Sequence, residues 1–509
     1  MDLSHNNTGY FPGMPVCDKH LSTEVSSDFT LPDYQSEIKR LLSTRAYLSI
    51  PNEYLGNSNA EIEGNLCYRI IYLGTDGKLY SASLEDKYSF SAPLEFTSNF
   101  VNPNDVTLLP ECSVEAVNTK VLGPRKLNVR TRLSCNVSAF SPFLHSTALT
   151  GTPSPSSVEY LMGNVSCIRI KRAKSESLSL SDFIPLDPQI DNVRVIDSAY
   201  SVQIDECIHT PSQIEVRGDV NLKIFYCNDA QSALPLSSVR NLPFTVNIPI
   251  DNDTSDCTAR GFVDDINLDI SENGINIELF LTICAQMQSS ENVTYVLDAY
   301  SKDHYCEGKN EVFGVWEPLT CKAARLTQNE VFSLDEIKLS KDAKIIDTYA
   351  RASINETKME NGKMLLLGKI EYQIIYHHDG EYSTATLNAP LRYEVKLNSV
   401  PAENDKIKCL ANANIISIRT RCDGDRIFFD TELKFNYIIQ KENKICALSE
   451  LKLGEKIHSS DGEIILCYPA HGTPLWNIAK QYKKSMHELK QNNSIPDAEQ
   501  IVKSKFLVI

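Results

Sequence analysis

The chain has 509 residues and a formal net charge of −16 at pH 7, and 42% of its residues are hydrophobic. This length is enough for roughly three to five domains, because domains typically have ~100–150 residues. The acidic balance argues against nucleic acid or an anionic membrane as the main partner, since both favour a basic surface.

The N-terminus and the cysteines favour a cytoplasmic protein. The opening MDLSHNNTGYFPGMPVCDKH has no basic start followed by an apolar run, which a secretory signal would require. No stretch approaches ~18 uninterrupted apolar residues, so we expect no transmembrane segment. The 15 cysteines include no C-x-x-C pair, which suits reduced thiols better than a disulfide framework.

Three stretches of the body share one pattern. They are GNLCYRIIY from Gly64, GDVNLKIFY from Gly218 and GKIEYQIIY from Gly368, and these glycines are 154 and 150 residues apart. In each stretch, alternate residues from the second to the eighth after the glycine are apolar or aromatic. Alternation with a period of two is typical of a β-strand with one buried face.

More strands are expected around each of these stretches. VIDSAYSVQI from Val195 matches IIDTYARASI from Ile345, and alternating segments follow downstream of each glycine. The pattern predicts a mainly β fold of tandem antiparallel β-sandwich-like repeats. GTPSPSSVEY from Gly151 and AKSESLSLSDF from Ala173 are rich in Ser and Pro, so we expect them to be exposed connections. The expected repeats are 25–147, 176–300 and 328–455.

The segment 463–509 has a different pattern, with apolar residues at i, i+3, i+4 and i+7 that indicate an amphipathic helix. We expect Thr473 to cap this helix and Pro474 to occupy its first position. A second helix is expected after Ser485, and the flanking EIILCY and FLVI are strand-like. These elements predict a small C-terminal βααβ module. The apolar residues of the first helix are Leu475, Ile478, Ala479 and Tyr482.

This segment resembles a LysM domain through both expected helices. It departs from the family where Thr473 and Pro474 replace the usual Asp-Thr pair, and where Lys503 and Ser504 replace the Gly that usually introduces the last strand. In the family these two loops border the groove that holds N-acetylglucosamine units. The matching residues are Tyr468, Gly472, Leu475, Trp476, Ile478, Ala479, Tyr482, Ser485, Leu489, Asn493, Ile495, Asp497, Ile501, Leu507 and Ile509.

The body resembles the tandem SPOCS domains of SipL-like spore coat morphogenetic proteins. DFTLPDYQSEIKRLL from Asp28 opens the first repeat, and three Gly-to-Tyr strands follow. Tandem SPOCS domains with one C-terminal LysM domain are the arrangement of that family. The resemblance implies a scaffold for spore coat assembly in the mother-cell cytoplasm, at the forespore surface during sporulation. Its LysM domain would bind a coat morphogenetic ATPase, stage IV sporulation protein A. The matching residues are Leu31, Pro32, Asp33, Glu37, Ile38 and Leu42.

We expect the partner-binding surface on the loops and first helix of this module. Pro474 offers no backbone N–H to a sugar oxygen, and Lys480 and Lys483 suit an acidic protein surface better than a neutral glycan. A protein partner is therefore the favoured interpretation, with binding of peptidoglycan or a chitin-type glycan as the alternative. The predicted partner-binding residues are Gly472, Thr473, Pro474, Leu475, Trp476, Lys480, Lys483, Ile495 and Asp497.

Catalytic motifs are absent from the sequence. It contains no G-x-S-x-G, no G-x-x-x-x-G-K-[ST], no H-E-x-x-H and no G-x-G-x-x-G. We therefore expect a non-enzymatic protein without a cofactor. Cys207 with His209, and His304 with Cys306, each place two possible ligands on one strand face. They would hold zinc if the fold brought them together, and otherwise they are unrelated side chains.

Overall fold

A computed structural model describes most of the chain: residues 8–56, 58–95, 105–150, 157–186, 193–228, 234–250, 256–337, 339–397, 401–402, 405–457, 464–496 and 506–509. Strands dominate these residues, and every sheet contains antiparallel neighbours. The prediction of a mainly β fold is confirmed.

Residues 8–146 form a first pair of packed sheets. Its strands are β1 (Thr8–Thr30), β2 (Ile38–Leu48), β3 (Asn52–Leu55), β4 (Asn59–Gly74), β5 (Leu79–Pro93), β6 (Thr107–Gly123) and β7 (Lys126–Ser146). In one sheet, β4 pairs with β5 on one side and with β2 and β3 on the other. In the second sheet, β7 lies between β1 and β6. Both sheets contribute to one buried hydrophobic cluster.

Two further sheet pairs follow the same strand order. The second is built from β9 (Val158–Pro185), β10 (Val193–Thr210), β11 (Gln213–Asn228), β12 (Leu236–Pro249), β13 (Asp256–Ser271) and β14 (Gly274–Ser301). The third is built from β15 (His304–Ser333), β16 (Lys344–Glu360), β17 (Lys363–His378), β18 (Glu381–Lys396), β19 (Ile407–Asp423) and β20 (Arg426–Lys456). Each has a sheet of three successive strands, β10-β11-β12 or β16-β17-β18. In the other sheet of each of these pairs, the first strand (β9 or β15) is hydrogen-bonded to the last strand (β14 or β20). The strand orders are β13-β14-β9 and β15-β20-β19. A short strand, β8 (Ala148–Thr150), pairs in parallel with β20.

The predicted alternating faces are buried in all three sheet pairs. Tyr226 and Tyr376, at the strand ends, are half-buried and pack against their clusters. The buried residues of the predicted faces are Leu66, Tyr68, Ile70, Tyr72, Val220, Leu222, Ile224, Ile370, Tyr372 and Ile374. The period of two therefore identifies the core strands correctly.

One predicted connection is wrong. Residues 173–183 lie within β9, which is paired with β14 along its length. Leu178 and Leu180 pack against the core of the second sheet pair, whereas Ser179 is exposed. The Ser-rich composition therefore comes from the solvent face of an edge strand. The strands β1, β9 and β15 begin at Thr8, Val158 and His304, upstream of the expected repeat starts at 25, 176 and 328.

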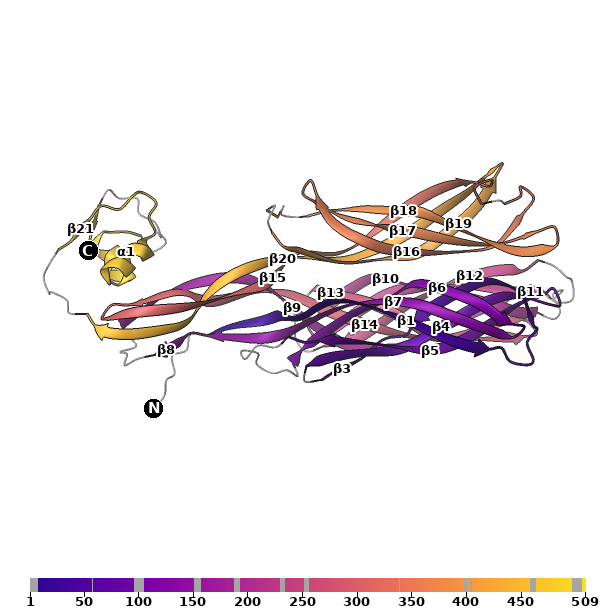
Figure 1. Cartoon of the computed structure of the whole chain (residues 1–509), viewed down its shortest axis with the longest axis horizontal. Coiled ribbons are helices and arrows are strands. Elements are labelled where there is room, and N and C mark those ends of the chain that lie inside the picture. The colour runs from indigo at the N-terminus through magenta and orange to yellow at the C-terminus, as the bar shows by residue number, and fades with distance from the viewer. Residues whose placement is uncertain are drawn as a thin grey trace.

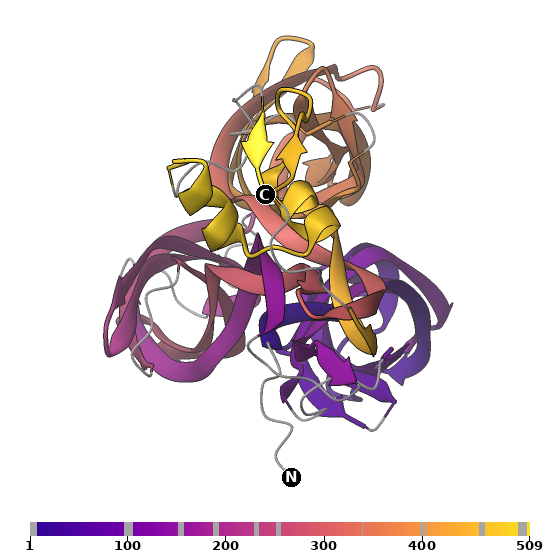
Figure 2. The same cartoon turned by 90° about the vertical axis from the view of Figure 1, so that its left-hand side faces the viewer.

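The three sheet pairs lie side by side around a common axis (Figures 1 and 2). The second strand of each pair has a β-bulge at Leu42, Ile196 or Ile346. A bulge redirects a side chain out of the regular alternation. All three bulged residues enter one cluster that also contains Phe225 and Ile375, so the three pairs share a core at this point.

Charged side chains are also buried where the pairs meet. Arg45 of β2 forms an ion pair with Asp197 of β10, and each side chain is 2% exposed. The Arg45 guanidinium lies 5.5 Å from the ring centre of Tyr349 in β16. Lys223 of β11 pairs with Asp347 of β16. These contacts connect all three sheet pairs.

Candidate partner-binding site

Residues 464–509 form the C-terminal module, of which 464–496 and 506–509 are described. Its elements are β21 (Leu466–Cys467), α1 (Leu475–Tyr482), α2 (Met486–Asn492) and β22 (Leu507–Val508). The two strands pair antiparallel, and the apolar faces of both helices pack into one cluster. Ser485 caps α2 as predicted, by accepting a hydrogen bond from the His487 N–H at 3.1 Å.

The start of α1 differs from the prediction. The helix begins at Leu475, and Pro474, in an extended conformation, is its N-cap. Gly472 has a φ of +86°, and the Thr473 hydroxyl donates back to the Ala470 carbonyl oxygen at 2.7 Å. Thr473 therefore closes the preceding turn, and the prediction that it caps α1 is wrong. Proline has no side-chain oxygen, so the first amides of α1 have no side-chain acceptor at this position.

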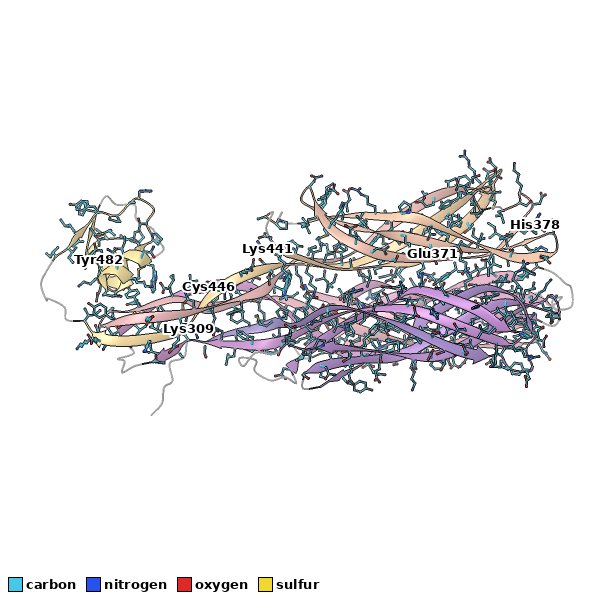
Figure 3. The ribbon with its side chains drawn as sticks, in the orientation of Figure 1. Lys309, Glu371, His378, Lys441, Cys446 and Tyr482 are labelled. Carbon is cyan, nitrogen blue, oxygen red and sulfur yellow. The ribbon has the colours of Figure 1, made fainter. Side chains whose placement is uncertain are left out.

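The module is docked on the end of the body through α1. The indole N–H of Trp476 donates to Asp298 Oδ2 at 2.8 Å, and Lys480 Nζ lies 2.8 Å from both oxygens of this carboxylate. Asp298 belongs to β14 of the second sheet pair. Figure 3 places Tyr482, the last residue of α1, near the strands that carry Lys309 and Cys446.

Tyr300 completes this docking contact. Its ring is fully buried and packs edge-on against Trp476, with 4.9 Å between the ring centroids. Its hydroxyl donates to the Lys484 carbonyl oxygen at 2.5 Å, and Lys483 Nζ lies 5.9 Å from its ring centre. Burial, helped by the nearby Glu159 and Glu488, raises the pKa of Tyr300, so the phenol stays protonated and remains a donor.

Two β-bulges shape the surface that receives the module. The register of β14 against β9 shifts at Leu297, directly before Asp298. The register of β15 against β20 shifts at Tyr305, directly before Cys306, whose side chain packs against the core of the module. Because a bulge changes where the next side chains point, these two irregularities place Asp298 and Cys306 at the contact.

The predicted partner-binding residues fall into three groups. Gly472 and Pro474 are exposed, and Thr473 is half-buried. Asp497 lies outside the described residues. The third group is engaged in the fold or the docking contact: Leu475, Trp476, Lys480 and Lys483, together with the half-buried Ile495, which packs against the module core. Trp476 is only 7% exposed because the module core and the body cover it from two sides.

Sequence reasoning did not identify Asp298 or Tyr300. They lie 178 and 184 residues from their hydrogen-bond partners Trp476 and Lys484. Within TYVLDAYSKD they are one polar and one aromatic residue of an ordinary strand. An interruption of the period-two alternation at Leu297 is the local signal that could have marked a bulge here.

The module also has an exposed apolar patch on its small sheet. Tyr468 is 72% exposed and Phe506 is 50% exposed, and their ring centroids are 6.2 Å apart. Ile464 and Leu466, shortly before Tyr468 in the chain, are also exposed, at 80% and 52%. This patch does not overlap the residues that contact Asp298.

The possible zinc ligands are not brought together. Cys207 packs against the core of the second sheet pair, whereas Cys306 packs against the C-terminal module. Within the described part of the chain, no group of three or more His, Cys, Asp or Glu side chains is arranged to hold a metal ion. We therefore assign no metal site to Cys207, His209, His304 and Cys306.

Comparisons with known proteins give no assignment. No protein-family model, no curated protein and no solved structure matches the chain. None of the helices in the described ranges is long and apolar enough to cross a membrane.

Proposed function

We propose that this protein is a non-enzymatic scaffold for spore coat assembly. The body would consist of three tandem SPOCS-type β-sandwich repeats, and the C-terminal module would be a LysM domain. Support comes from three sheet pairs with one strand order, followed by a strand, two helices and a strand. The protein would act in the mother-cell cytoplasm at the forespore surface.

The module is proposed to bind a coat morphogenetic ATPase similar to stage IV sporulation protein A. The observation that carries this proposal is the face of α1, which presents an indole N–H and an ammonium to a protein carboxylate. This face already makes a protein contact, and charge-assisted hydrogen bonds of this kind recognise acidic groups. The body would leave other surfaces for further coat proteins.

The test is capture of the coat ATPase from an extract of sporulating cells by the full-length protein. Lys480→Glu should reduce capture, because it reverses a charge on the proposed face. Lys452→Glu, at an exposed position outside the module, is the matched control, because it reverses a charge in the same direction. Undiminished capture by the Lys480→Glu variant would contradict this proposal.

Glycan binding is the second candidate, and one observation favours it. The exposed rings of Tyr468 and Phe506 offer apolar faces on which sugar rings could stack. In that case the purified protein should sediment with peptidoglycan, and Tyr468→Ala should prevent this. Sedimentation with peptidoglycan, without capture of any coat protein, would favour the glycan candidate over the scaffold.

A further inference from the structure

Asp298 is held by α1 as a ligand carboxylate would be held. Trp476 and Lys480 are four residues apart, so both side chains lie on the same side of the helix. Lys480 contacts both oxygens of Asp298, and Trp476 donates to one of them. Asp298 Oδ1 also accepts a hydrogen bond from the neighbouring Ala299 N–H at 2.9 Å.

The docking contact has a buried part, Tyr300 and Trp476, and a partly exposed part, the ion pair between Lys480 and Asp298. The side chains of Lys480 and Asp298 are still 41% and 30% exposed, so water and salt screen their attraction. The body and the module are joined through residues 458–463. A short link gives the tethered carboxylate a high effective concentration, which compensates for weak binding. A partner in solution would therefore have to displace a tethered ligand whose ion pair is partly screened by solvent.

We propose that Asp298 and Tyr300 are an internal ligand that occupies the partner site of the C-terminal module. The true partner presents an acidic segment whose carboxylate replaces Asp298. This inference rests on the proposed function, since the site is the one assigned to the coat ATPase. Lys483 and Lys484, at the end of α1, add positive charge that attracts an acidic segment. One face of α1 cannot hold both carboxylates, so partner binding opens the docking contact.

Charge reversal in the full-length protein tests both the docking contact and its competition with the partner. Asp298→Lys places two ammonium groups together, so hydrogen exchange of 475–482 and 297–301 should become faster. Its affinity for the purified coat ATPase should rise roughly three- to tenfold, because no fraction of the site is closed. Glu307→Lys is the matched control, since Glu307 is an exposed carboxylate on the neighbouring strand β15. It should change neither measurement.

A charge swap separates docking from partner binding. Lys480→Glu alone should open the contact and weaken binding of the coat ATPase. Combining it with Asp298→Lys restores an ion pair between the body and the module, so exchange should return toward the wild-type rate. Binding of the coat ATPase should stay weak in this double variant, because an acidic partner meets a carboxylate at position 480.

The outcomes distinguish the two proposals. Unchanged exchange in Asp298→Lys would overturn the internal-ligand contact. Faster exchange with an unchanged, measurable affinity for the coat ATPase would overturn the competition while leaving the proposed function in place. Faster exchange with no binding of the coat ATPase by any variant would overturn the proposed function and, with it, the acidic partner.

Discussion

Arg45 and Asp197 illustrate how single residues join separate sheets. They come from different sheet pairs, and both side chains are almost completely removed from water. Burying either charge alone is unfavourable, and their attraction offsets this only while both are present. The pair therefore favours the observed arrangement of the sheet pairs over arrangements that separate its partners.

Arg45→Met should lower the free energy of unfolding by about 3–5 kcal/mol, because it leaves the Asp197 carboxylate buried without its counter-charge. Arg45→Met combined with Asp197→Leu should be much less destabilising. Urea unfolding measures the loss of stability in the single and in the double variant. The control is Glu360→Gln, since Glu360 and its partner Lys358 are 48% and 46% exposed, and it should change stability by less than about 1 kcal/mol. Equal losses in the single and double variants would show that packing, not charge, dominates at this site.

Tyr72 gives a prediction about pH. Its side chain is fully buried, its hydroxyl donates to the Ser36 carbonyl oxygen at 3.1 Å, and burial raises its pKa to about 12. An unfolded tyrosine ionises near pH ~10, so above that pH the unfolded state binds fewer protons than the native state. The contribution of the Tyr72 phenol to the free energy of unfolding is complete below about pH 10 and is lost as the pH rises through about 12.

The free energy of unfolding should therefore fall by up to about 1.4 kcal/mol per pH unit from this residue alone. Urea unfolding between about pH 8 and 11 measures the slope. Tyr72→Phe should make the slope shallower, whereas Tyr34→Phe, at a position that is 86% exposed, should not. A slope that is the same in the Tyr72→Phe variant and the wild type would show that Tyr72 does not cause this pH dependence.

At the scale of elements, the strands could be predicted where their periodicity was clear. The strands that follow Gly64, Gly218 and Gly368 alternate without interruption, and their predicted faces are buried. Residues 173–183 alternate as well, but their Ser-rich solvent face resembles a linker in composition. Asp298 could not be found, because its role depends on a bulge and on contacts with residues far along the chain. Local sequence carries neither kind of information.

The glycines that open the second and third predicted strands share a structural role, whereas a Cβ atom at Gly64 would meet the side chain of Tyr88 instead. A Cβ atom at Gly368 would lie 1.8 Å from the Ser353 carbonyl oxygen, and one at Gly218 would lie 2.1 Å from that of Gln203. Both oxygens belong to the neighbouring strand of the same sheet. The strands approach closely just before the second bulge of β10 and of β16, where only glycine fits.

Gly368→Ala should therefore destabilise the protein by about 1–3 kcal/mol, because backbone must move to admit the methyl group. Gly123→Ala is the control, since the nearest atom to a Cβ there is 3.9 Å away. It should be neutral or slightly stabilising, by less than about 1 kcal/mol. Thermal unfolding of the two variants measures the difference, and similar melting temperatures would argue against a close approach at Gly368.

At the scale of the whole molecule, the three sheet pairs share two buried clusters in addition to the core that each pair has of its own. One cluster joins Phe11 of the first pair, Cys167 and Tyr295 of the second, and Val315 and Ile445 of the third. The bulged residues belong to another cluster that all three pairs share. Independent domains on a string would need no such contacts, since each would bury its own apolar surface. The body should therefore behave as one cooperative unit, although its sequence has three parts.

We expect the body to unfold in a single transition, with the calorimetric and van't Hoff enthalpies in agreement. Residues 158–301, produced alone, contain the complete second sheet pair but would expose Cys167, Ile196, Phe225 and Tyr295, which the other pairs cover. This fragment should unfold at a lower urea concentration than the same residues within the full chain, because it loses the apolar burial between pairs. A chain lacking 464–509 serves as the control, since it keeps all three pairs and loses only the module. It should unfold at nearly the same urea concentration as the full-length body. Three separate transitions, or a fragment as resistant as the whole chain, would show that the shared clusters add little and that each pair is stable independently.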